Sequence, residues 1–236
     1  MSEASDPASV DVVIPACNAA HYIGEAIASA LAQEPAVRKV FVVDDGSIDA
    51  TQDVARGFGT RVDTQRQSNS GAARARNAGI ALATAPLVAF LDADDRWLPG
   101  HIERGLRNLA ARPGNGFVCA RLRTFPSPEL PPGEQAALRA RNAEYQDGWV
   151  ASTLIVRRDV LERVGGFADD LRVAEVIDWF DRARAQGVRG DMLDTVQVER
   201  RLHRNNTTRV ADLRGYLVAA KRHLDRIRSR GGGPDA

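Results

Sequence analysis

The chain has 236 residues, of which 44% are hydrophobic and 27% charged, so it can bury one sizeable core. Lysine plus arginine (32) almost equals aspartate plus glutamate (31), and this balance argues against nucleic acid as the main partner. Two widely spaced cysteines, no signal-peptide pattern and no run of ~18 apolar residues predict a cytoplasmic protein whose membrane contact is at most peripheral.

The first hundred residues alternate between two periodicities. Apolar runs that predict buried strands lie at 10–15, 39–47, 60–65 and 86–92, and segments with helical spacing lie at 19–33, 49–58 and 70–85. Strands that alternate with helices in this way predict an α/β fold, with a mostly parallel sheet covered by helices on both faces.

The second half of the chain is less regular. Helices are predicted at 99–111, 158–167, 173–187 and 209–230, and strands at 116–125, 149–158 and 194–203, while four prolines keep 125–133 irregular. We therefore expect one domain over residues 10–209. A disordered tail is expected at 1–9, an amphipathic helix at 210–229 and a second disordered tail at 230–236.

Polar and flexible residues follow each strand of the first half. They are Pro15–Asn18, Asp44–Ser47, Gln67–Gly71 and Asp92–Asp95. Because the carboxyl ends of parallel strands meet at one edge of a sheet, these residues are expected to converge there and to form the ligand site.

Three carboxylates, those of Asp92, Asp94 and Asp95, stand directly after a predicted buried strand. Like charges this close repel, so at least one would keep its proton unless a cation lay among them. Mg²⁺ is typically held by one or two carboxylates together with phosphates, and an Asp-x-Asp pair can offer two. The cluster predicts a divalent-cation site beside a diphosphate.

Five segments resemble, in order and spacing, the motifs of glycosyltransferase family 2. They are PACNAAHYIGEAIASALAQ, FVVDDGSIDAT, NSGAARARNAGIALA, LVAFLDADDRWLPG and VRRDVLERVGGF. The resemblance implies a GT-A (Rossmann-like) fold with a nucleotide-sugar half at about 10–98 and an acceptor half at about 99–209. It also implies inverting transfer of a hexosyl or N-acetylhexosaminyl group, assisted by Mn²⁺ or Mg²⁺.

The same resemblance implies which residues meet the donor, for which we expect a UDP-sugar. Those assigned to the nucleotide sugar are Pro15, Ala16, Asn18, Asp44, Asp45, Asn69, Arg74, Arg76, Asp92, Ala93, Arg201 and Arg204. Those assigned to the metal are Asp92, Asp94, Asp95 and His203. The family often has an aromatic residue at the position of Cys17, so the resemblance does not imply base stacking there. Arg201 and Arg204 are expected to fold over the diphosphate as part of a closing loop.

The general base is the weakest match to the family. The family usually carries Glu-Asp at the start of a helix in its second half, and the matching stretch AEVIDW has Val176 where an acid is usual. Glu175 and Asp178 remain on one helical face, and Asp178 is slightly favoured as the base that takes a proton from the acceptor.

Two alternative functions stay open at this point. A nucleotide-sugar-binding protein with little or no transfer activity would fit the altered Glu-Val pair, whereas a GT-A-like nucleotidyltransferase would want a glycine-rich basic loop where this chain has PACNAAHY. The acceptor is open as well, among a glycan, a lipid-linked sugar, a small metabolite and a peptide. The basic C-terminal helix, with Leu213, Leu217, Ala220, Leu224 and Ile227 on one face, is either a membrane-surface anchor or packed on the domain, and packing is favoured.

Overall fold

The computed structural model describes residues 9–141, 145–204, 206 and 214–231, so most of the two predicted tails lies outside the described residues. The helices are α1 (Ile23–Leu31), α2 (Thr51–Arg56), α3 (Ala72–Leu82), α4 (His101–Ala111), α5 (Pro132–Arg141), α6 (Arg158–Val164), α7 (Glu175–Ala185) and α9 (Arg214–Gly231). The strands are β1 (Val10–Ala16), β2 (Val37–Asp45), β3 (Val62–Gln67), β4 (Leu87–Phe90), β5 (Arg96–Trp97), β6 (Asn115–Pro126), β7 (Gln146–Asp147), β8 (Ile155–Arg157) and β9 (Arg189–Leu202).

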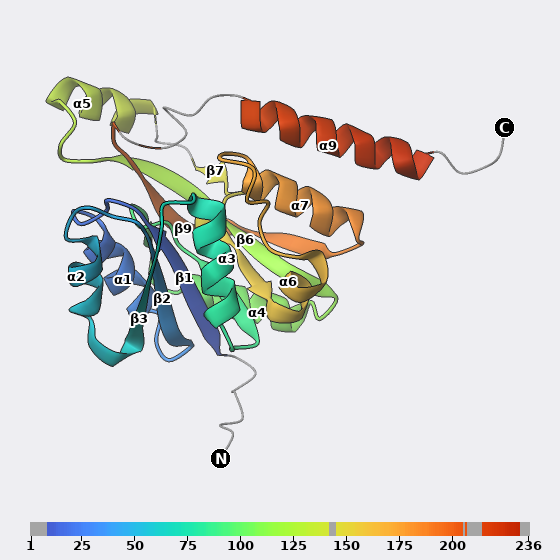
Figure 1. The fold of residues 1–236 in the computed structure, drawn as a ribbon, viewed down its shortest axis with the longest axis horizontal. Coiled ribbons are helices and arrows are strands. Elements are labelled where there is room, and N and C mark those ends of the chain that lie inside the picture. The colour runs from blue at the N-terminus through green and yellow to red at the C-terminus, as the bar shows by residue number, and fades with distance from the viewer. Residues whose placement is uncertain (1–8, 142–144, 205, 207–213, 232–236) are drawn as a thin grey trace, which may run out of the picture.

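The described strands form one nine-stranded sheet in the order β3-β2-β1-β4-β8-β6-β9-β5, with β7 paired to β6 (Figure 1). The predicted parallel arrangement of the first half is confirmed, since β1 pairs in parallel with β2 and β4, and β2 with β3. The second half is mixed: β8 is antiparallel to β4 and β6, whereas β6 and β9 are parallel. The first strands therefore all end at one edge of the sheet, as predicted.

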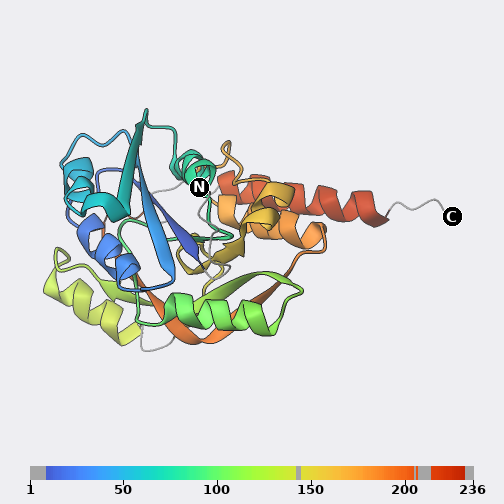
Figure 2. The ribbon, with the colours of Figure 1, turned by 90° about the horizontal axis from the view of Figure 1, so that it is seen from below.

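Helices cover both faces of the sheet, because successive residues of a buried strand point to opposite sides. On β1, Val12 and Ile14 join the core under α1 and α4, while Val13 joins the core under α3, α6 and α7. Figure 2 shows α1 and α3 on opposite sides of these strands. Gly79 lets α3 approach β1 closely, since a Cβ at this position would lie 2.3 Å from Val13 Cγ1.

The stretch at 149–158 differs from the strand that the sequence predicts. It is a 3-10 turn at Ala151–Thr153 followed by the short strand β8. The hydroxyl of Thr153 donates to the backbone carbonyls of Gly148 and Val150, and such local bonds compete with a strand ladder. The helix α5 is a further difference, and it begins at a proline, which the first turn of a helix tolerates.

The C-terminal helix α9 lies along α7 (Figures 1 and 2), but its predicted packing face is wrong. Leu217, Leu224 and Ile227 are 69%, 52% and 53% exposed. The helix meets the domain through Ala219 and through arginines on the opposite face, whose carboxylate partners hold it there. Leu213 lies outside the described residues, and in the part of the chain that is described no helix is long and apolar enough to span a bilayer.

His101 gives the fold a testable dependence on pH. It is fully buried at the start of α4 against Trp97, with ring centroids 4.8 Å apart, and neither ring nitrogen has a hydrogen-bond partner among the described residues. Burial lowers the pKa of this histidine to about 3. Between that value and the ordinary pKa of ~6.5, the unfolded chain binds a proton at this position that the folded protein does not.

We therefore expect this histidine to cost about 2 kcal/mol of unfolding free energy when the pH falls from ~7 to ~5. In His101→Leu this contribution should disappear, so denaturant unfolding of the variant should depend less on pH over that interval than unfolding of the wild type. Identical pH slopes for the two proteins would contradict the assignment.

Candidate active site

Asp44 and Asp45, at the end of β2, hold together the loops of the nucleotide half. The Asp45 carboxylate accepts hydrogen bonds from the backbone N–H groups of Ser70 and Gly71, each at 2.8 Å, and from the side chain of Gln67 at 2.8 Å. Asp44 is fully buried and accepts from the Ser47 N–H at 2.9 Å. The two carboxylates thus fix the turn after β2 and the entry to α3.

The loops after β1 and β3 join the same edge. Asn18 donates its backbone N–H to the Ser47 hydroxyl and accepts from the Ile48 N–H, each at 2.9 Å. Asn69 donates from its side chain to the exposed Cys17 sulfur, at 3.3 Å. Pro15 and Ala16, the last residues of β1, are buried. The predicted convergence of these strand ends is therefore present in the structure.

Arg76 links the acidic segment after β4 to the start of α7. Its side chain, only 5% exposed, donates to Asp92 at 2.7 Å and to Glu175 at 2.6 Å. Burial alone would lower the pKa of Arg76, but the two carboxylates raise it above its ordinary value. Burial alone would raise the pKa of Asp92, but the charge and hydrogen bond of Arg76 outweigh it and hold that pKa below its usual value. Arg74, in contrast, lies at the surface and pairs with Asp169.

Asp94 is brought against His203, which is 109 residues away in the sequence. The Asp94 Oδ2 atom lies 2.9 Å from His203 Nε2, and the Asn206 side chain donates to the same oxygen at 3.2 Å. The Asp94 side chain stays 27% exposed, whereas that of His203 is 11% exposed. This pair is the part of the predicted metal set that the structure places in contact.

Asp95 turns away from Asp94 and into the protein. One of its oxygens accepts from the Ser152 hydroxyl at 2.7 Å, and the other accepts from the Arg201 backbone N–H at 3.0 Å. Burial, followed by the charges of Asp94 and Asp92, raises its pKa well above the ordinary value. Asp95 thus stands as a buried link between segments, which differs from the metal ligand expected from the sequence.

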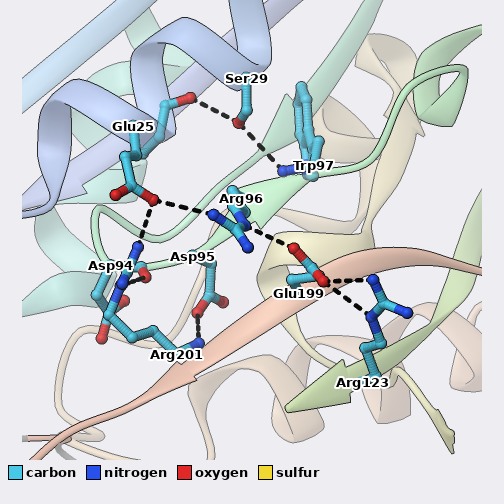
Figure 3. A network of polar contacts seen from close by, with 10 residues as sticks. Glu25, Ser29, Asp94, Asp95, Arg96, Trp97, Arg123, Glu199 and Arg201 are labelled. Atoms are coloured by element: carbon cyan, nitrogen blue, oxygen red, sulfur yellow. Dashed lines mark hydrogen bonds and ion pairs between the residues drawn. The ribbon is translucent and has the colours of Figure 1, made fainter. Parts of the chain in front are cut away.

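Arg201 also has a different place from the one predicted (Figure 3). Its side chain, 4% exposed, donates to the Asp94 carbonyl at 3.1 Å and to Glu25 at 2.6 Å, and it lies between the rings of Tyr22 and Phe125. These contacts hold the buried side chain against the Asp94 segment and α1, which differs from the closing-loop position expected from the sequence. Arg204, the other predicted clamp, is exposed.

Figure 3 shows that the contacts continue through α1, β5, β9 and β6. Glu25 also pairs with Arg96, at 3.3 Å, and Arg96 pairs with Glu199, at 2.5 Å. Glu199 in turn accepts from Arg123, at 2.6 Å. This series of alternating charges joins α1 to strands of the second half, next to the Asp94 segment.

Asp178 meets α9, whereas Glu175, one turn before it, meets Arg76. Asp178 is 2% exposed, and its two oxygens accept from Arg182 at 2.8 Å and from Arg226 of α9 at 3.1 Å. Val176, at the position where the family usually has an acid, packs in the core with Trp179. The placement of Asp178 argues for a link between α7 and α9 and against the base role that the sequence favoured.

The donor atoms at this edge suit a hard divalent cation. A carboxylate oxygen of Asp94 is an ordinary ligand of Mn²⁺ or Mg²⁺, whereas the imidazole nitrogen of His203 suits a transition metal such as Mn²⁺ better than Mg²⁺. Among the described residues no group of three or more His, Cys, Asp and Glu side chains could hold a metal ion. Asp94 and His203 thus offer two donor atoms, so a cation held there would need its other ligands from outside the protein.

Several residues at the site carry no signal in the sequence. Asn206 fixes Asp94 and the His203 backbone, Ser152 bonds the segment after β4 at both Asp92 and Asp95, and Glu25 holds Arg201. Apart from the contact between Asn206 and His203, which are three residues apart, each partner is far away in the sequence, so only the fold reveals these contacts. Asn206 lies at the end of the stretch RRLHRNN, three residues after His203.

Comparisons with known proteins agree with this arrangement. Residues 11–165 match the family model described as glycosyl transferase family 2. The succinoglycan biosynthesis protein ExoU of Rhizobium meliloti is 33% identical over 213 residues, which cover 79% of this chain and 60% of that protein. Glycosyltransferase AglE of Haloferax volcanii is 30% identical over 203 residues, which cover 75% of this chain and 62% of that protein. The chain thus spans about three fifths of the length of these relatives.

Solved structures show the same fold at low sequence identity. The crystal structure of S. aureus TarS 1–349 in complex with UDP-GlcNAc has a TM-score of 0.76 and 17% identity, covering 93% of this chain and 66% of that one. The likeness confirms the mixed α/β, GT-A type of fold predicted from the sequence. The family model matches well over half of the residues, and the chain belongs to glycosyl transferase family 2.

Proposed function

We propose that this protein transfers a hexosyl or N-acetylhexosaminyl group from a nucleoside diphosphate sugar to an acceptor, with inversion and with the help of Mn²⁺ or Mg²⁺. Family membership supports the reaction class. The observation that carries the metal-assisted form is the 2.9 Å contact between Asp94 and His203 at the carboxyl edge of the sheet. A UDP-sugar is the proposed donor, since a protein of the same fold binds UDP-GlcNAc.

In this proposal the donor lies across the loops after β1, β2 and β3. The nucleoside would meet the segment from Pro15 to Asn18 and the turn that Asp45 fixes, because these groups line the edge to which the parallel strands point. The diphosphate would lie toward Asp92 and Asp94. The acceptor would lie over residues 99–209, which we keep as the acceptor half.

Asp94 and His203 would hold the cation, with oxygens of the diphosphate among its other ligands. A bound cation at this place neutralises negative charge that develops on the departing nucleoside diphosphate. Asn206 orients the Asp94 carboxylate, and Arg201 fixes the backbone carbonyl of the same residue. The side chains around Asp94 therefore set its direction before the donor binds.

Glu175 is the proposed general base. It stands at the first turn of α7 and shares Arg76 with Asp92, so it is the helix carboxylate that lies next to the donor edge. As the acceptor oxygen attacks the anomeric carbon, the bond to the diphosphate oxygen breaks and the acceptor proton passes to Glu175. Arg76 donates to the Glu175 carboxylate at 2.6 Å, so in this proposal Arg76 shifts its contact toward the diphosphate when the proton is taken up.

That same ion pair, together with Val176, supports a second candidate. A protein that binds the nucleotide sugar but transfers poorly would keep Asp94 and His203 and lack a free base. Product formation separates the two candidates, because only the enzyme releases nucleoside diphosphate in step with a glycosylated acceptor. Membership of glycosyl transferase family 2 leaves the nucleotidyltransferase alternative without support.

Removing either proposed metal ligand should weaken donor binding only when metal is present. We expect Asp94→Asn and His203→Ala to lose roughly tenfold or more in affinity for UDP with Mn²⁺, measured by titration calorimetry, while affinity without metal changes little. Asp63→Asn, on the far edge strand β3 with a largely exposed carboxylate, is the matched control. Wild-type affinity in both metal-ligand variants, with Mn²⁺ present, would exclude the site.

The two helix carboxylates should fail in different ways. Glu175→Gln should keep UDP affinity and lower the transfer rate roughly 10²- to 10⁴-fold, because it removes proton transfer while keeping the shape of the side chain. Transfer assays on a panel of nucleotide sugars measure this effect, and full activity in Glu175→Gln would show that another residue is the base.

Asp178→Asn should lower the free energy of unfolding by about 1–3 kcal/mol, since it weakens two buried hydrogen bonds from arginines. Thermal melts of the variant and the wild type measure this effect.

A further inference from the structure

The helix α9 is packed with its charged face inward. Arg222 pairs with Asp170, and His223 and Arg226 pair with Asp181 of α7. Small residues also touch the domain: Ala219 is 5% exposed, and Gly215 is so close to Val173 that a Cβ there would lie 2.6 Å from Val173 Cγ2. Amphipathic surface helices usually bury their apolar stripe, so this orientation is reversed.

The opposite face of α9 is apolar and open. Leu217, Leu224 and Ile227 are each at least half exposed, and they recur at helical spacing, so they form one stripe. Lys221 and Arg228 are exposed and, at 100° per residue, stand beside Leu217 on the same outward side. Two bases, Lys221 and Arg228, thus lie on the outward side, and α9 holds a single acid, Asp225, so this face is both apolar and basic.

The stripe continues into a groove between α7 and α9. The groove has a volume of about 400 Å³, and its lining includes Trp149, Ile177, Phe180 and Tyr216. Trp149 and Ile177 are themselves 40% and 50% exposed. Most of the large exposed apolar side chains among the described residues thus lie on α9 or beside it, and scattered single residues would not cluster in this way.

Charge distinguishes between two occupants of this face. A second copy of the chain, related by a two-fold axis, would bring the same stripe against itself, with Lys221 and Arg228 of each copy near those of the other. Asp225 is the only acid in α9 that could offset them. A surface of anionic phospholipid offers both an apolar layer and negative phosphates, and therefore complements the whole face.

We propose that α9 binds the surface of an anionic phospholipid bilayer, with its axis in the plane of the interface. The leucine stripe enters the boundary between head groups and acyl chains, and Lys221 and Arg228 contact lipid phosphates. The ion pairs to Asp170 and Asp181 keep the helix on the domain, so the whole protein is held at the bilayer. This inference does not depend on the proposed reaction.

Co-sedimentation of the full chain with vesicles tests the proposal. The protein should sediment with vesicles of phosphatidylcholine containing phosphatidylglycerol and remain in solution with pure phosphatidylcholine. Leu217→Ser combined with Leu224→Ser should abolish sedimentation, and Lys221→Glu combined with Arg228→Glu should weaken it roughly tenfold or more and reduce its dependence on salt. Leu82→Ser and Arg163→Glu, exposed residues on α3 and α6, are the controls and should bind as the wild type does.

Brominated lipid gives an independent readout. Of the three tryptophans only Trp149 is exposed, since Trp97 and Trp179 are 3% and 0% exposed, so quenching of fluorescence should require Trp149 and vanish in Trp149→Phe. All changed side chains on α9 are exposed, and unchanged thermal melts will show that the variants fold. The proposal is overturned if the wild type stays in solution with anionic vesicles at low salt, or if the double serine variant and the double glutamate variant both bind as the wild type does. It is also overturned if the wild type is a dimer that Leu217→Ser combined with Leu224→Ser converts to a monomer.

Discussion

One buried guanidinium joins the two halves of the chain. Arg76 comes from α3, Asp92 follows β4 and Glu175 opens α7, and the arginine holds both carboxylates at hydrogen-bond distance while almost wholly excluded from solvent. Removing one partner from such a buried set leaves an uncompensated charge in the protein interior. The stability lost in this way is much larger than the net stability that the intact set contributes. The three groups therefore constrain one another, and the distance from the acidic segment to α7 is fixed by this contact.

The surroundings of each carboxylate at the edge set what it can do. Asp45 is saturated by backbone N–H groups, Asp92 is paired with a guanidinium, and Asp95 is buried beside like charges that raise its pKa. Asp94 keeps part of its surface open and meets an imidazole. Four acids that look equivalent in the sequence thereby have different surroundings: one closes loops, one holds Arg76, one links segments, and Asp94 alone stays open enough for the ligand role proposed for it.

These different surroundings explain which features of the fold and the site could be predicted from the sequence. The strands of the first half, the edge at which they end and the pairing of Asp94 with His203 follow from periodicity, parallel-sheet topology and the family motifs. The inward turn of Arg201, the role of Asp178 and the exposed stripe of α9 depend on partners that are dozens to well over a hundred residues away, such as Glu25 and Arg226. Local patterns give the type of an element, but they do not say which neighbour meets each of its faces.

The helix α7 connects the two proposals. Its first residue, Glu175, faces the donor edge, while Asp178 and Asp181 on the same helix hold α9. The first turn of α9 packs on Val173, two residues before Glu175. If α9 lies on a bilayer, the proposed base is therefore held close to that surface. If both proposals hold, a lipid-linked sugar, one of the acceptor classes that the sequence leaves open, would present its head group where α7 begins, next to the proposed base.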